Sequence, residues 1–80
     1  MNNILIQYSR NRRGQLNGCV LAVGPNKLGW SLCRKGDKFT KKHARASAWA
    51  RAILGTGGNI PHSLESIVPR MKERSVKYFK

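Results

Sequence analysis

Residues 40–55 read TKKHARASAWARAILG, and this stretch decides the fold because it is the clearest helical sequence in the chain. Before Gly55 it contains five alanines and neither proline nor glycine, a composition that favours helix. Asp37 or Thr40 can cap the N-terminus, and Gly55 stands where a helix commonly ends. The sequence therefore predicts one main helix over about residues 38–54.

The faces of this helix differ in the size of their side chains. At about 100° per residue, one wide stripe is apolar, and we expect it to cover a sheet. The stripe consists of Phe39, Ala46, Trp49, Ala50, Ile53 and Leu54. Another face repeats alanine every four residues, at Ala44, Ala48 and Ala52. This strip has two interpretations. Its small side chains let a phosphate backbone or a partner helix approach closely, or it is an exposed face that uses alanine because alanine is the best helix former. We expect Trp30 and Trp49 to lie in the core.

The first half of the chain is predicted to form strands, over about residues 3–9, Cys19–Val23 and Leu28–Cys33. Their short connections favour an antiparallel meander. After the main helix, Pro61 can open a short helical piece, and residues 70–79 are predicted to form a short helix. The expected fold class is α+β: a three-stranded antiparallel sheet packed by one main helix, with a short helical C-terminus. Residues 1–80 should form a single small domain.

Charge is the strongest functional signal in the chain. Sixteen Lys and Arg oppose three Asp and Glu, which gives a net charge of +13. A small domain with this charge repels itself unless a polyanion or an acidic protein is its neighbour, and nucleic acid is the default partner. No segment approaches the ~20 apolar residues of a membrane span, and the N-terminus does not resemble a secretory signal. We expect an intracellular protein without membrane contact, with Cys19 and Cys33 as reduced thiols.

The candidate nucleic-acid-binding residues are basic side chains in two segments. At the predicted start of the main helix, free N–H groups and the helix dipole favour an anion. Lysines in the first helical turn interact unfavourably with the helix dipole and so lower the stability of the helix. Their presence there therefore favours a role in phosphate binding. The predicted site consists of Lys38, Lys41, Lys42, Arg45 and Arg51 on this helix, with Arg10, Arg12 and Arg13 as an auxiliary Arg-rich loop.

Catalytic and metal-binding sites find little support in the sequence. Three carboxylates and two histidines do not form a recognisable group of nucleophile, base and orienting residue. His62 and Glu65 lie close in sequence, but no third group completes a mechanism. The spacing C-x13-C-x9-H-x18-H lacks the short ligand pairs of structural zinc sites. We therefore expect no enzyme activity, no cofactor and no metal.

Three segments of the chain resemble small basic proteins of tailed bacteriophages. These segments are Gly29-Trp30-Ser31-Leu32-Cys33, then Asp37-Lys38-Phe39-Thr40-Lys41-Lys42, and later Ala48 with Arg51-Ala52. The resemblance implies a phage origin and expression in the cytoplasm of a bacterial host. It implies no particular activity.

Strands followed by Thr40-Lys41-Lys42-His43-Ala44-Arg45 and an alanine-rich helix are also similar to the last third of double-stranded RNA-binding domains. In those domains a lysine pair at the N-terminus of the helix binds phosphates across a groove. This resemblance covers about residues 18–54 and implies that Lys41, Lys42 and Arg45 are phosphate ligands.

Two functions follow from this reasoning. The first is non-catalytic, largely sequence-nonspecific binding of nucleic acid through phosphates, by a monomer or weak dimer. The alternative is a small phage inhibitor that uses the same basic surface on an acidic host or defence protein, as an anti-CRISPR or polymerase-binding protein does. Whether the nucleic acid is DNA or RNA, single- or double-stranded, stays open.

Overall fold

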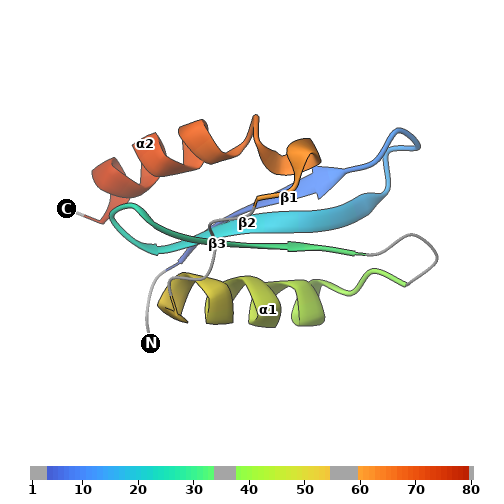
Figure 1. Cartoon of the computed structure of the whole chain (residues 1–80), viewed down its shortest axis with the longest axis horizontal. Coiled ribbons are helices and arrows are strands. Elements are labelled where there is room, and N and C mark those ends of the chain that lie inside the picture. The colour runs from blue at the N-terminus through green and yellow to red at the C-terminus, as the bar shows by residue number, and fades with distance from the viewer. Residues whose placement is uncertain (1–3, 34–37, 55–59, 80) are drawn as a thin grey trace.

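The computed structural model describes residues 4–33, 38–54 and 60–79. Three strands, β1 (Leu5–Arg10), β2 (Leu16–Gly24) and β3 (Lys27–Leu32), form one antiparallel sheet in the order β1-β2-β3 (Figure 1). The main helix α1 (Lys41–Leu54), a short 3-10 turn η1 (His62–Leu64) and the C-terminal helix α2 (Val68–Tyr78) follow the sheet. The predicted α+β fold class is confirmed.

The central strand β2 is longer than the predicted Cys19–Val23, because the hairpin turns at its two ends are compact. Between β1 and β2, the Asn11 side-chain oxygen accepts hydrogen bonds from the backbone N–H groups of Arg13 and Gln15, at 2.9 and 3.0 Å. Gly14 takes the positive φ, 78°, that this turn requires. Between β2 and β3, Asn26 has a φ of 58°, a conformation that asparagine tolerates better than most residues.

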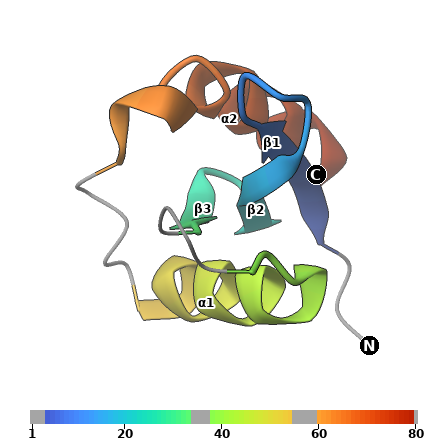
Figure 2. The same cartoon turned by 90° about the vertical axis from the view of Figure 1, so that its right-hand side faces the viewer.

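Helices cover both faces of the sheet, so the molecule has three layers (Figure 2). Alternate residues of the central strand β2 point in opposite directions. Cys19 and Leu21 belong to the core on the α1 side, whereas Val20 and Ala22 belong to the core on the α2 side. All four are at most 1% exposed. The uninterrupted apolar run in β2 thus reflects a strand buried on both faces.

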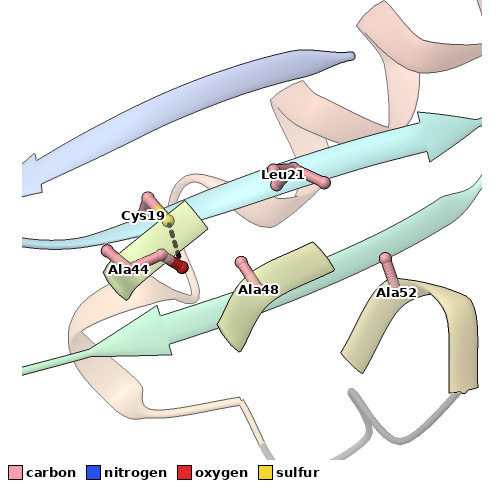
Figure 3. Packing of buried hydrophobic residues seen from close by; sticks show 5 residues of the cluster. All are labelled: Cys19, Leu21, Ala44, Ala48 and Ala52. Carbon is pink, nitrogen blue, oxygen red and sulfur yellow. Dashed lines mark hydrogen bonds between the residues drawn. The ribbon is translucent and has the colours of Figure 1, made fainter. Parts of the chain in front are cut away.

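The predicted orientation of α1 is wrong. Its alanine strip, rather than its wide apolar stripe, packs on the sheet: Ala44, Ala48 and Ala52 are at most 4% exposed and point toward Cys19 and Leu21 (Figure 3). The strip is therefore neither a free docking surface nor an exposed run of helix-forming residues.

Most of the apolar stripe faces outward instead. Trp49, Ile53 and Leu54 are 45%, 47% and 72% exposed, so the expectation that Trp49 is a core residue is also wrong. The physical reason lies on β3, where Gly29 allows the backbone of α1 to approach closely. Large side chains on the inner face of α1 would hold the helix away from this glycine. Phe39, just before α1, does pack against the α1-side core as predicted.

The C-terminal segment builds the core on the other face. Leu64 and Met71 are fully buried there, and Trp30 packs against the same cluster from β3, as expected of a core tryptophan. Pro69 stands in the first turn of α2, where its missing N–H is harmless. The buried Ser75 hydroxyl accepts a hydrogen bond from the backbone N–H of Asn26 at 3.1 Å, which joins α2 to the β2–β3 turn.

Candidate anion-binding site at the start of α1

Thr40 is the N-cap of α1. Its carbonyl accepts the backbone N–H of Ala44 at 3.0 Å, and its hydroxyl accepts the N–H of His43 at 3.4 Å. A hydroxyl is a preferred capping group because it satisfies one of the free N–H groups of the first turn. The helix therefore begins at Lys41, three residues later than predicted. Asp37, the other predicted cap, lies outside the described residues.

A cavity of about 510 Å³ lies between the end of β3 and the first three turns of α1. Its lining combines two cationic side chains, an imidazole, several hydroxyls and an apolar floor. The lining residues are Ser31, Leu32, Cys33, Lys38, Phe39, Thr40, His43, Ala44, Ser47 and Arg51. Sequence reasoning identified Lys38 and Arg51 but missed His43 and Ser47. The signal was present, because His43, Ser47 and Arg51 are spaced by four residues and so share one helix face.

The other predicted lysines and Arg45 lie outside the cavity. Lys42 and Arg45 are exposed on α1 and do not line it. Lys41 is also exposed, and its ammonium lies 5.2 Å from the centre of the Tyr8 ring on β1, within reach of a cation–π interaction. The predicted cluster is therefore divided: Lys38 lines the cavity at the end of β3, whereas Lys41, Lys42 and Arg45 are exposed on other faces of α1, with Lys41 over the opposite edge strand β1.

Arg51 has a structural role that the sequence did not indicate. It donates a hydrogen bond of 2.6 Å to the carbonyl of Trp30 on the edge strand β3, and its guanidinium lies 4.0 Å from the centre of the Trp30 ring. Arg51 is half-buried, unlike the other predicted site residues that the structure describes. The side chain is therefore held in one orientation at the wall of the cavity.

The Arg-rich loop lies at the same end of the molecule as the start of α1 (Figure 1). Register explains this shared end: Leu32 at the end of β3 pairs with Gly18, and the N–H of Cys33 bonds to the carbonyl of Asn17 at 2.7 Å, beside the β1–β2 turn. Arg10 donates to the carbonyl of Gly14 at 2.6 Å, which folds its side chain back along the turn. Arg12 and Arg13 are exposed.

Negative charge is concentrated elsewhere. The two carboxylates that the structure describes, Glu65 and Glu73, both belong to the segment from η1 to α2. Glu65 is 3.1 Å from a ring nitrogen of His62, and Glu73 is 3.6 Å from the ammonium of Lys77. Within residues 4–33, 38–54 and 60–79, no ion pair neutralises the basic side chains around the cavity. This end of the described molecule is strongly positive.

Two further findings concern metal binding and membrane spans within the described residues. Within the same three ranges, no group of three or more His, Cys, Asp and Glu is gathered closely enough to hold a metal ion. None of the described helices combines the length and the apolar character needed to cross a bilayer. Comparison of the chain with protein-family models, with curated proteins and with solved structures finds no significant match.

Proposed function

We propose that this chain is a non-catalytic protein that binds nucleic acid through its phosphates, largely without regard to sequence. The observation that carries the proposal is that the start of α1 and the Arg-rich loop lie at the same end of the molecule (Figure 1). Both described glutamates lie in a different segment. Phosphate contacts of this kind position a protein on nucleic acid without reading bases.

Within this proposal the basic residues have different roles. Lys42 and Arg45 are exposed on α1 and contact the backbone directly, with Lys38 at the rim of the cavity. Arg12 and Arg13 contact a second stretch of backbone from the hairpin turn. Arg10, Lys41 and Arg51 each already interact with a neighbouring group, so they contribute charge with less freedom to rearrange.

The salt dependence of affinity tests this proposal. For about five phosphate contacts, the slope of log affinity against log salt should be near −4.5 on a generic duplex, at roughly −0.9 per contact. Replacing Lys38, Lys42 and Arg45 together with Gln should make that slope shallower by about 2.7. A control with the same loss of charge replaces Lys27, Lys72 and Lys77, which are exposed outside the proposed surface. This control should change the slope by less than about 1.

A wild-type slope shallower than about −1 would remove the electrostatic argument altogether. Equal changes of slope in the two triple variants would show instead that the overall charge governs binding and that the basic surface of α1 has no special role. Thermal unfolding of each variant distinguishes loss of binding from loss of the fold.

One observation favours a second candidate function, binding to an acidic host or defence protein in a bacterial cytoplasm. Trp49, Ile53 and Leu54 are exposed on α1, and Trp49 lies one helical turn beyond the exposed Arg45. A phosphate backbone needs no apolar surface, whereas protein interfaces are enriched in tryptophan. Retention of a protein from nuclease-treated bacterial lysate, lost in a Trp49→Ala variant, would favour this function over nucleic-acid binding.

A further inference from the structure

The cavity at the start of α1 differs from the exposed basic surface of Lys42 and Arg45, because it is concave and partly apolar. Its volume of about 510 Å³ falls within the range of about 300–1,000 Å³ typical of small-molecule sites. Contacts to the phosphates of a continuous duplex come from exposed basic and polar groups and do not require such a space. The chemistry of the lining therefore needs its own explanation.

The lining has the three parts that a nucleotide requires. Lys38 and Arg51 provide positive charge, and Phe39 and Leu32 provide an apolar wall. His43 and Ser47 add hydrogen-bonding groups on the helix side of the cavity. Cations bind phosphate, aromatic rings stack on bases, and side-chain polar groups bond to base edges. A single nucleotide satisfies all three parts, whereas inorganic phosphate uses only the first.

Two of these groups are already held in place. The guanidinium of Arg51 is fixed by the Trp30 ring at 4.0 Å and by one hydrogen bond of 2.6 Å to the Trp30 carbonyl. Because a guanidinium has five N–H donors, others remain for a phosphate. The Phe39 ring packs edge-to-face against Tyr8, with ring centres 6.3 Å apart. Groups that are ordered before binding lose less conformational entropy when the ligand arrives.

We propose that this cavity holds one unpaired nucleotide of the bound nucleic acid, with its base against Phe39 and its phosphate at Arg51 and Lys38. This inference rests on the proposed function and specifies its preferred substrate. The chain should bind a duplex with a single-stranded tail more tightly than a blunt duplex of equal charge. The exposed surface of Lys42 and Arg45 supplies the affinity that both substrates share.

The experiment compares a blunt duplex with a duplex of equal phosphate number that ends in a short single-stranded tail, by fluorescence anisotropy at one salt concentration. The wild type should prefer the tailed duplex by at least about fivefold, the lower end of what stacking one base provides. Ser47→Leu fills the cavity and should abolish this preference while affinity for the blunt duplex stays within twofold. Ser63→Leu, the same change at an exposed site in η1, should preserve the preference.

Competition with small molecules provides a second measurement that does not depend on the fold of a variant. Adenosine 5′-monophosphate should displace the tailed duplex from the wild type at lower concentration than either adenosine or inorganic phosphate. It should displace the blunt duplex no better than inorganic phosphate does.

Three results would overturn the inference. The first is equal affinity of the wild type for tailed and blunt duplexes, and the second is a tail preference that survives Ser47→Leu. The third is displacement by inorganic phosphate as effective as displacement by the nucleotide, which would identify a simple anion site. All three leave the proposed function intact, because that function fails only if salt-dependent binding to both duplexes is absent. A tail preference abolished by Trp49→Ala but not by Ser47→Leu would place the single strand on the outer face of α1.

Discussion

Gly29 of β3 lies directly against the backbone of Ala48 in α1. A Cβ atom added to Gly29 would overlap the carbonyl oxygen of Ala48 and stand 2.5 Å from the backbone nitrogen of Ala52. Real Cβ atoms do not approach backbone atoms this closely, so the glycine and the alanine strip together set the distance between helix and sheet. This contact determines which face of α1 is buried and hence which side chains line the cavity.

Gly29→Ala should destabilise the fold by about 3 kcal/mol or more, because the helix backbone must move away from β3 and open the core around Ala48. Gly24→Ala is the control: its added Cβ would meet nothing closer than the Lys27 side chain at 3.6 Å, an ordinary contact. Urea unfolding followed by far-ultraviolet circular dichroism measures both. Similar midpoints for the two variants would show that the helix does not pack closely on Gly29.

The same contact explains what the sequence did and did not predict. The bounds of α1 were predictable within three residues, because helix formers run without interruption up to Gly55. The buried face was not, since the usual inference places the bulkiest apolar stripe inside. Here a glycine on a neighbouring strand reverses that inference, and the glycine and the alanines are far apart in the sequence. The hydrophobic pattern of a single element does not contain this information.

The site was predictable in part for a related reason. The basic residues of α1 and of the β1–β2 turn were visible in the sequence, and their position at one end of the molecule follows from the antiparallel register. The cavity was not visible, because it requires knowing that His43, Ser47 and Arg51 face the end of β3. That orientation is again a consequence of the alanine strip packing on the sheet.

The two tryptophans should respond differently to truncation. Trp30→Ala removes a side chain packed against the α2-side core and also removes the ring on which the Arg51 guanidinium lies. It should therefore lower the free energy of unfolding by about 3 kcal/mol. Trp49→Ala removes a side chain that is 45% exposed and should cost less than about 1 kcal/mol. Chemical unfolding of both variants measures these costs. A larger loss for Trp49→Ala would support the original expectation that the apolar stripe of α1 faces the core.

Arg51 should resist conservative replacement, although it lies on a helix rich in exposed basic residues. Lysine keeps the charge but cannot lie flat on the Trp30 ring while donating to the Trp30 carbonyl, so Arg51→Lys should cost about 1–2 kcal/mol. Arg45→Lys, on the exposed surface of the same helix, should stay within about 0.5 kcal/mol of wild type. Thermal and urea unfolding provide the comparison. Equal stability of the two variants would mean that the Arg51–Trp30 contact contributes nothing in solution.

Cys19 should make the stability of the fold depend on pH in alkaline solution. Its thiol is fully buried and donates to the carbonyl of Ala44 at 3.5 Å (Figure 3). Burial raises the pKa of the Cys19 thiol to about 11, against a smaller opposing effect of the Arg45 charge. Because the folded protein disfavours the thiolate, this contribution to stability is fully present below the unfolded pKa of about 8.5–9. It is lost as the pH rises through the folded value.

Comparison with Cys19→Ala isolates this contribution, because lysine and tyrosine titrations affect both proteins alike. The free energy of unfolding of wild type minus that of Cys19→Ala should be constant up to about pH 8.5 and then fall by about 2 kcal/mol by pH 11. Urea unfolding at a series of pH values measures the difference. A difference that stays constant across this range would mean that the thiol ionises as readily in the folded protein as in the unfolded chain. Rapid alkylation of native Cys19 by iodoacetamide at pH 8 would contradict the prediction independently, because only the thiolate reacts and the buried group should remain protonated.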